Sequence, residues 1–213
     1  MDMKLIFATA NKGKIREAGE ILGADYEIVT PADMGIFEDV EENGLTLQDN
    51  SLLKAEHLYA LSQSDCFADD TGLEVEALGG APGVMSARYA GDGHDNEANM
   101  AKLLSELEKS GPEASRRARF RTVVTLFYQG EKHVFEGSME GSIAHAKAGK
   151  GGFGYDPIFI PDDFPGHTLA EISEDEKNAI SHRGKAIRAM AAFLARCRSC
   201  RLDADVLQGS RQD

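Results

Sequence analysis

The sequence contains little cysteine and few long apolar runs, and its charge is mostly of one sign. Its cysteines are Cys66, Cys197 and Cys200, an odd number that does not make a disulfide framework. Cys197 and Cys200 form a C-x-x-C, which could be a redox pair or half a zinc site. No second C-x-x-C and no nearby histidine completes such a site, so we interpret the pair as a chance feature of an arginine-rich tail.

Apolar stretches are too short for a membrane protein. The longest one near the C-terminus spans Ala189 to Ala195, whereas a membrane-spanning helix needs about 20 residues. The first residues lack the basic start and the apolar stretch of a signal peptide. We therefore expect a cytoplasmic protein that has no membrane partner.

Positive charge is also scarce, because 23 lysines and arginines face 36 aspartates and glutamates, for a net charge of −13. An acidic surface repels the phosphates of DNA and RNA, which argues against polynucleotide binding. A small phosphorylated substrate is still compatible with this charge, because lysines and arginines can gather in one cleft. We expect that cleft to be locally basic.

The pattern of apolar residues predicts an α/β fold. Strand and helix patterns alternate at the start of the chain, and a long antiparallel hairpin follows, which together indicate a mixed sheet. The 213 residues suit one domain over residues 1–196, followed by a polar tail over residues 197–213 that we expect to be disordered. The expected strands are Lys4–Thr9, Tyr26–Val29, Cys66–Ala68, Ala118–Tyr128 and His133–Ile143; the expected helices are Lys14–Leu22, Thr46–Leu61, Asn96–Leu107 and Lys185–Cys197.

The first strand leads into T-A-N-K-G-K, from Thr9 to Lys14. Small residues at a strand-to-helix turn leave backbone N–H groups free at the helix N-terminus, which favours an anion. Thr9, Asn11 and Lys14 could add side-chain donors. The spacing is not that of a Walker loop, and an ordinary polar turn is the simpler interpretation of this segment on its own.

Acidic pairs offer candidate metal ligands. Asp69 and Asp70 follow a buried strand, and adjacent carboxylates at a strand end commonly hold Mg²⁺. Only one of the two can point into a given cleft, because successive strand residues face opposite ways. Glu41 and Glu42 could complete the site. The alternative is that both pairs are solvated loop residues.

Two later segments suit recognition of a purine base. Gly149 to Gly154 contains a literal G-x-G-x-x-G, but Tyr155-Asp156-Pro157 blocks the helix that a dinucleotide site requires. We interpret this segment as a loop that approaches a ligand closely, with Phe153 and Tyr155 offering aromatic faces. Lys177, His182 and Arg183 then concentrate hydrogen-bond donors, which recognition of keto oxygens needs.

In combination, these segments resemble the inosine triphosphate pyrophosphatase family, whose members hydrolyse non-standard purine nucleoside triphosphates. The resemblance runs from Lys4 to about Leu194. It rests on motifs that occur in order along the chain: T-x-N-x-x-K, A-D-D-[ST]-G-L from Ala68, G-G-A-P-G with S-A-R-Y, G-G-F-G-Y-D-P from Gly151, and S-H-R-G from Ser181.

The resemblance implies an elongated mixed sheet with helices on both sides, two lobes flanking a substrate cleft, a homodimer and a Mg²⁺ cofactor. It implies that Asp70 is the catalytic proton acceptor and a metal ligand, and that Glu41 or Glu42 is a second metal ligand. The substrate-binding residues that it implies are Thr9, Asn11, Lys14, Lys54, Thr71, Phe153, Gly154, Tyr155, Asp156, Lys177, His182 and Arg183.

The expected reaction converts ITP, dITP or XTP to the monophosphate and pyrophosphate, which would cleanse the nucleotide pool. It needs an in-line water, a base and neutralisation of the triphosphate charge. Two alternatives are a pyrophosphatase for pyrimidine triphosphates and a catalytically silent nucleotide-binding regulator. The S-H-R-G and F-G-Y-D segments disfavour the first, and an intact Asp69-Asp70 with Lys14 disfavours the second.

Overall fold

The computed structural model describes residues 3–38 and 40–209, with side chains up to Ser199. The strands are β1 (Met3–Phe7), β2 (Tyr26–Val29), β3 (Cys66–Val75), β4 (Arg117–Tyr128), β5 (Glu131–Ile143) and β6 (Phe159–Pro161). The α-helices are α1 (Lys12–Leu22), α2 (Leu47–Ser62), α3 (Asn96–Lys109), α4 (Glu174–Ile180) and α5 (His182–Gly209). Short 3₁₀ helices are η1 (Gly23–Asp25), η2 (Ala32–Met34), η3 (Glu76–Leu78), η4 (Gly83–Arg88) and η5 (Asp156–Ile158).

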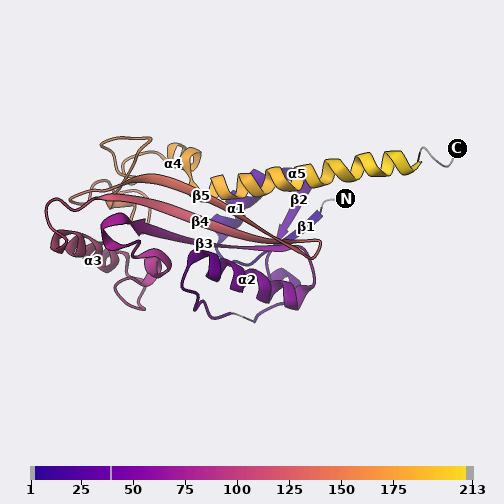
Figure 1. The fold of residues 1–213 in the computed structure, drawn as a ribbon, viewed down its shortest axis with the longest axis horizontal. Helices are drawn as coiled ribbons and strands as arrows, with labels where there is room; N and C mark the ends of the chain where they lie inside the picture. Colours follow the sequence, from indigo (N-terminus) through magenta and orange to yellow (C-terminus); the bar gives the residue numbers. More distant parts are fainter. Residues whose placement is uncertain (1–2, 39, 210–213) are drawn as a thin grey trace.

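The strands form one six-stranded sheet in the order β2-β1-β3-β4-β5-β6. β1 pairs in parallel with β2 and β3, whereas β3, β4, β5 and β6 pair antiparallel. The long strands β3, β4 and β5 lie along the length of the molecule in Figure 1 and give it an elongated shape. This mixed sheet confirms the predicted fold class.

The β4–β5 hairpin forms where the sequence predicted it. Gln129 and Gly130 connect the strands with positive φ angles of 55° and 82°. A two-residue hairpin turn with both φ values positive matches the twist of its strands, and it favours glycine in the second position. The turn fixes the register of the two longest strands.

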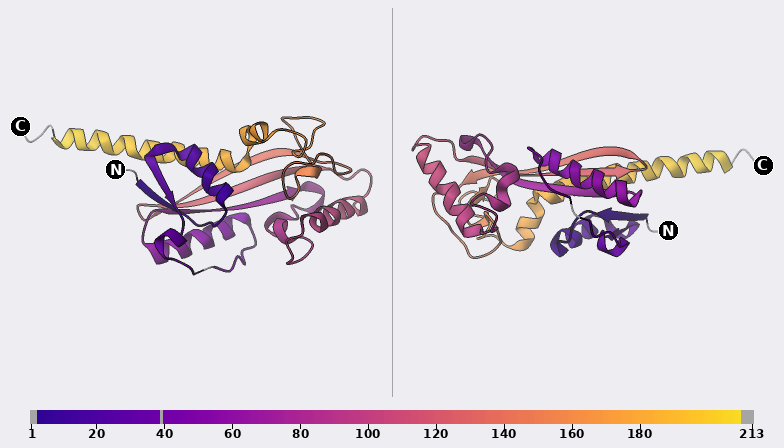
Figure 2. Two further views of the ribbon diagram at one scale, coloured as in Figure 1. Left: turned by 180° about the vertical axis from the view of Figure 1, so that it is seen from behind. Right: turned by 90° about the horizontal axis from the view of Figure 1, so that it is seen from below.

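Helices cover both faces of the sheet, as expected (Figure 2). Alternate residues of β1 point to opposite faces. Leu5 and Phe7 pack in a core cluster with α1 and α5, whereas Ile6 packs in a separate cluster with Leu58 of α2. The period-two alternation therefore gives the strand an apolar contact on each side.

A further core cluster lies toward the other end of β3. Leu73 and Val75 pack there with apolar residues of α3, β4, β5 and the 155–169 segment. Phe67, at the start of the same strand, belongs to the cluster with α1 and α5. The polar residues Asp69, Asp70 and Thr71 thus lie between two hydrophobic cores joined by one strand.

Most predicted elements end within two residues of their observed bounds, but β3 and α5 extend well beyond the predictions. β3 does not end before the acidic pair but continues to Val75, because its whole length pairs with β4. Charged residues and glycine are poor strand formers, so local pattern stopped the predicted strand too early. Gly72 is required there, since a Cβ would lie 2.4 Å from the carbonyl oxygen of Gly83.

The last helix is longer than the predicted Lys185–Cys197. It begins at His182, where the Ser181 hydroxyl accepts the Gly184 N–H, and it continues to Gly209, past the body of the molecule in Figure 1. No proline or glycine interrupts residues 185–208. The separate tail over residues 197–213 stays a prediction; residues 210–213 and the Cys200 side chain lie outside the described part. Within that part, no helix is long and apolar enough to cross a membrane.

Candidate active site

The turn between β1 and α1 is ordered by its own side chains. The Asn11 carboxamide oxygen accepts the backbone N–H groups of Gly13 (2.9 Å) and Lys14 (3.2 Å), so Asn11 is the N-cap of α1. The Thr9 hydroxyl accepts the Asn11 N–H at 3.2 Å. Asn11 therefore occupies N–H groups that we had predicted to be free for an anion. What the turn offers a phosphate is the Asn11 amide, the Thr9 hydroxyl and the helix N-terminus.

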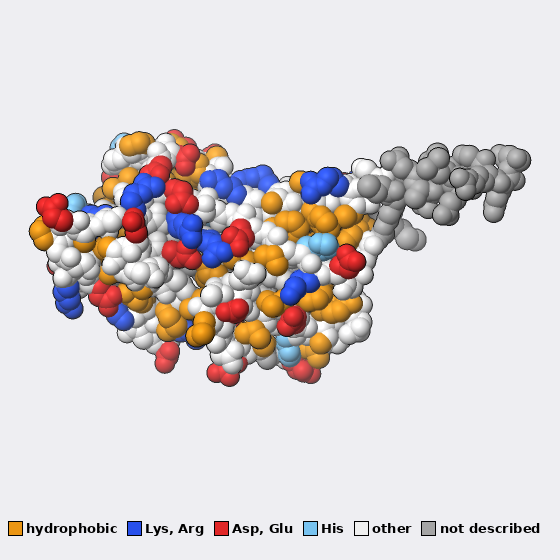
Figure 3. All heavy atoms as spheres, in the orientation of Figure 1, with side chains coloured by type: hydrophobic (Ala, Val, Ile, Leu, Met, Phe, Trp, Pro, Cys, Tyr) orange, Lys and Arg blue, Asp and Glu red, His pale blue; other side chains and the backbone are white. Residues whose placement is uncertain are grey.

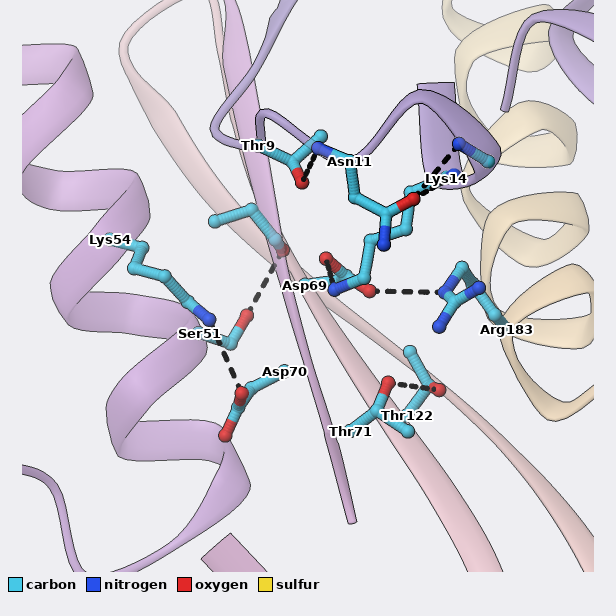
Figure 4. A network of polar contacts seen from close by, with 12 residues as sticks. Thr9, Asn11, Lys14, Ser51, Lys54, Asp69, Asp70, Thr71, Thr122 and Arg183 are labelled. Atoms are coloured by element: carbon cyan, nitrogen blue, oxygen red, sulfur yellow. Dashed lines mark hydrogen bonds and ion pairs between the residues drawn. The ribbon is translucent and has the colours of Figure 1, made fainter. Parts of the chain in front are cut away.

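The two adjacent acids of β3 point to opposite faces of the sheet. In Figure 4, Asp69 lies with Lys14 and Arg183 on one side of the strand, and Asp70 lies with Lys54 of α2 on the other. This is the strand alternation that the sequence predicted. The alternation gives the two carboxylates separate partners and separate roles.

Asp69 is an ion-paired, buried carboxylate. Its side chain is 1% exposed and accepts hydrogen bonds from Lys14 Nζ (2.8 Å) and Arg183 Nε (3.2 Å). Burial opposes ionisation, but the two cations outweigh it and hold the pKa of Asp69 below its usual value. With both oxygens engaged, Asp69 connects α1 to α5 and is poorly placed to take a proton from water.

Asp70 has the opposite electrostatic setting. Burial, together with the nearby Glu42 carboxylate, raises the pKa of Asp70 despite the attraction of Lys54. Lys54 Nζ donates to Asp70 Oδ1 at 3.2 Å and to Glu42 Oε2 at 2.8 Å. Asn50 donates to Asp70 Oδ2 at 3.4 Å and accepts the Gly44 N–H at 2.8 Å. These bonds connect the loop from Glu41 to Gly44, called the acidic loop below, to β3. A raised pKa suits a carboxylate that accepts a proton.

The carboxylates of Asp70 and Glu42 fit a magnesium ion. One ammonium group bridges them, so their oxygens already converge on a single positive charge. No cluster of three or more acidic, histidine or cysteine side chains that could hold a metal occurs within residues 3–38 and 40–199. Mg²⁺ commonly uses one or two carboxylates and completes its shell with water and phosphate oxygens. Both Glu41 and Glu42 are exposed, and Glu42 is the one that shares Lys54 with Asp70.

A chain of hydroxyl groups links β3 to the start of α5. The hydroxyls of Thr71 and Thr122 lie 2.8 Å apart, and the Thr122 hydroxyl lies 2.7 Å from His182 Nδ1. Burial lowers the pKa of His182 to about 3, and the charges of Arg183, Lys177 and Lys185 act in the same direction against a smaller effect of Asp69. His182 is therefore neutral at physiological pH and contributes hydrogen bonds rather than charge.

The glycine-rich segment forms a loop, not a dinucleotide fold. Gly152 lies against Asp156, whose carboxylate accepts the Phe153 N–H at 2.8 Å and pairs with Lys177. Lys177 Nζ also lies 4.6 Å from the centroid of the Phe153 ring, which is 70% exposed. Phe153 thus presents a free aromatic face beside an ammonium group.

Tyr155 does not have the exposed face that we predicted. It is 5% exposed, packs in the cluster with Leu73 and Val75, and donates its hydroxyl to the Ser86 carbonyl at 2.9 Å. The glycines around it turn the chain so that Phe153 points outward and Tyr155 inward. Its contribution to the site is to hold the loop, since its ring is covered.

The charge of the site also differs from the prediction of a basic cleft. The cations Lys14, Lys54, Lys177 and Arg183 each pair with at least one carboxylate. The sequence revealed the cations but not these pairings. On the face drawn in Figure 3, positive and negative side chains are likewise interspersed rather than separated by sign. Because its cations are already compensated, the site would need added positive charge to hold a polyanion.

Sequence reasoning missed three residues that organise the site: Asn50, Thr122 and Glu17. Asn50 is 2% exposed in the first turn of α2, and a buried asparagine inside a helix is itself a signal of a specific hydrogen bond. Thr122 had no signal, because threonine is ordinary in a strand. Glu17, on α1, accepts hydrogen bonds from Ser181 and Arg183, residues 164 and 166 positions away along the chain.

Comparison with known proteins places the fold in a defined class. The fold matches the Staphylococcus aureus Ham1 protein with a TM-score of 0.82 and 40% identity, covering 90% of this chain and 98% of that one. It matches a HAM1 protein from Coxiella burnetii with a TM-score of 0.84 and 35% identity, covering 91% and 99%. The chain is an α/β protein of the Ham1 fold.

Comparison of the sequence gives the same family as comparison of the fold. Residues 5–193 match the Ham1 family, and the chain belongs to that family. It is 46% identical over 194 residues to the dITP/XTP pyrophosphatase of Christiangramia forsetii, covering 91% of this chain and 100% of the relative. It is 52% identical over 193 residues to the dITP/XTP pyrophosphatase of Porphyromonas gingivalis, covering 90% and 97%. The family predicted from the motifs is confirmed.

Proposed function

We propose that this protein is a dITP/XTP pyrophosphatase, which hydrolyses non-standard purine nucleoside triphosphates (ITP, dITP and XTP) to the monophosphate and pyrophosphate. The observation that carries the proposal is the full-length similarity to relatives with that activity, 46% and 52% identical over about nine-tenths of the chain. The arrangement around Asp70 supports it, because a carboxylate whose pKa is raised, as suits a proton acceptor, stands beside the ammonium group of Lys54.

The residues act together at the edge of β3 beyond Phe67, the last residue that pairs with β1, where a substrate crossing the edge can reach side chains of both faces. Thr9, Asn11 and Lys14 bind the phosphate chain at the N-terminus of α1. Asp70 orients the attacking water and accepts its proton as the bond between the α- and β-phosphates breaks. Lys54 neutralises phosphate charge once its ammonium is shared with the substrate. The oxygen of the water becomes bonded to the α-phosphorus, which gives the monophosphate, and the β- and γ-phosphates leave together as pyrophosphate.

A magnesium ion would be held by Asp70 and Glu42, whose oxygens meet at Lys54 Nζ. When bound, Mg²⁺ supplies charge neutralisation and polarises the phosphate oxygens. The ion pairs of Lys14 with Asp69, and of Lys54 with Glu42 and Asp70, explain why the protein's own cations are not enough.

The base binds where Phe153 exposes its ring and where Lys177 and Arg183 present donors. Hypoxanthine and xanthine carry a keto oxygen at position 6, which accepts hydrogen bonds. Adenine carries an amino group there, so a donor would face a donor and both would lose their hydrogen bonds. Thr71 follows Asp70 in β3, and its hydrogen bond to Thr122, which in turn contacts His182, connects Asp70 to the start of α5.

The active form that we propose is a homodimer in the cytoplasm. The dimer rests on the resemblance to the inosine triphosphate pyrophosphatase family. Exposed apolar side chains near the acidic loop, at Phe37, Leu45 and Met85, are suited to a subunit contact.

Pyrophosphate release from ITP, dITP, XTP, dTTP and ATP, with and without Mg²⁺, tests the function. We expect release from the first three only, and only with Mg²⁺. Preferential release from dTTP would indicate a pyrimidine enzyme. Tight nucleotide binding without release would indicate a regulator, and either result would overturn the proposal.

A further inference from the structure

Glu17 lies at a junction that the reaction as proposed does not use. It is a half-buried residue of α1, one turn after Lys14, and its carboxylate reaches across to the start of α5. Oε1 accepts the Ser181 hydroxyl at 2.8 Å, and Oε2 accepts Arg183 Nη1 at 3.1 Å. One side chain of the phosphate-binding helix therefore contacts both the cap and the second residue of α5.

The contact with Ser181 fixes where α5 begins. The Ser181 hydroxyl accepts the Gly184 N–H at 3.0 Å while it donates to Glu17. A carboxylate beside a helix N-terminus is also favoured by the helix dipole. The first turn of α5, which carries His182 and Arg183, is thus held to α1 as well as to the sheet.

The contact with Arg183 fixes the plane of its guanidinium. Asp69 accepts from Nε at 3.2 Å and Glu17 accepts from Nη1 at 3.1 Å. Because the guanidinium is planar and rigid, two carboxylates on different elements leave it little freedom to rotate. Nη2 makes no hydrogen bond to the described residues, so it is the nitrogen that remains for a ligand.

We propose that Glu17 is a positioning residue for base recognition: it directs Arg183 Nη2 at the keto oxygen of the purine and so sets discrimination between ITP and ATP. This inference rests on the proposed function, because it needs a base that Arg183 reads. Glu17 contacts Arg183 directly and Ser181 at the start of the same helix, so its effect on the base is exerted through Arg183, which the contact with Ser181 helps to place.

The test compares Glu17→Gln with a matched control, Glu20→Gln. Glu20 lies one turn further along α1 and is mostly exposed, with a loose pair to Arg16 at 3.9 Å. Losing one charge-assisted hydrogen bond should lower kcat/KM for ITP about 10-fold. For ATP, which gains nothing from Arg183, it should change little, so the ratio of the two values falls by the same factor. Binding of inosine monophosphate, measured by calorimetry without Mg²⁺, should weaken in parallel.

A second comparison distinguishes positioning from general damage. If Glu17 acts through Arg183, then Glu17→Gln should have no further effect on the ITP-to-ATP ratio in an Arg183→Gln background. A thermal melt of each variant checks folding. Glu20→Gln should match the wild type in every measurement.

Three results would overturn the inference: Glu17→Gln behaving like Glu20→Gln, equal losses for ITP and ATP, or an undiminished loss in the Arg183→Gln background. These differ from failure of the proposed function, which would show in the wild type itself. A wild-type enzyme that releases no pyrophosphate from ITP, or as much from ATP, would overturn both.

Discussion

Replacing Asp70 by asparagine is expected to remove turnover while it leaves the protein as stable as before. The change keeps the shape of the side chain but removes its charge and basicity. Loss of general-base action costs about 10²- to 10⁴-fold in rate, and a weakened magnesium site adds to that. The free energy of unfolding should stay the same for two reasons. Lys54 retains its ion pair with Glu42 at 2.8 Å, and the variant no longer buries the charge of a carboxylate whose pKa burial raises.

The same substitution at Asp69 is expected to have the opposite signature. Asp69 is 1% exposed and pairs with Lys14 and Arg183, so asparagine leaves two cations without this buried counter-charge. Breaking a buried pair by removing one partner costs about 3–5 kcal/mol. We take the lower end, about 3 kcal/mol, because Arg183 keeps Glu17. For a chain of this size that lowers Tm by about 6–12 °C.

Two measurements on both variants decide the matter: kcat with ITP at saturating Mg²⁺, and thermal or urea unfolding without nucleotide. We expect Asp70→Asn to lose turnover at unchanged Tm, and Asp69→Asn to lose stability and raise KM more than it lowers kcat. A folded Asp70→Asn enzyme with near-wild-type turnover would place the catalytic carboxylate elsewhere. An Asp69→Asn enzyme as stable as the wild type would refute the role given to the buried ion pairs.

Four further outcomes are expected. Glu42→Gln should raise the Mg²⁺ concentration for half-maximal turnover about 10-fold or more, while Glu41→Gln leaves it unchanged; equal effects would contradict the assignment to Glu42. The wild type should prefer ITP to ATP by about 10⁴-fold in kcat/KM, and comparable values would rule out donor-based reading of the base. Light scattering at micromolar protein should give about twice the 23.0 kDa chain mass, which a clean monomer would disprove. Because the pKa of His182 is lowered to about 3, below its usual value near 6.5, only the unfolded state binds its proton between these pH values. As the pH falls from about 6.5 to about 3, the free energy of unfolding of the wild type should therefore decrease by up to about 1.4 kcal/mol per pH unit relative to His182→Asn. Parallel pH profiles of the two proteins would show that His182 titrates normally in the folded protein.

The local patterns of the sequence were enough for most of the fold. The capping boxes of Thr46 with Asp49 and of Ser173 with Glu176 are local features of this kind, because each needs only residues three positions apart. The hairpin turn at Gln129-Gly130 is equally local. Where partners came from elsewhere in the chain, as in the pairing that extends β3 to Val75, local pattern failed.

The same difference between local patterns and contacts with distant residues holds for the candidate site. Motifs identified the residue types, and strand alternation correctly separated Asp69 from Asp70. The pairings came from tertiary contacts, such as Lys54 with Glu42 and Arg183 with Glu17, and no spacing rule reports them. For that reason the sequence predicted a basic cleft where the cations are compensated, and it predicted an exposed Tyr155 where the ring is buried.

The alignment of β3 with β4 carries a consequence for which changes in length this chain can tolerate. Asp69 lies opposite Val124 and Asp70 opposite Val123, within an uninterrupted ladder from Cys66 to Val75. If a one-residue insertion or deletion ahead of Asp69 shifts β3 against β4, every later side chain of β3 turns to the other face of the sheet. Asp70 would then meet Lys14 and Arg183, and Asp69 would meet Lys54. Such a change in length should therefore abolish activity even in a chain that still folds, although neither aspartate is replaced.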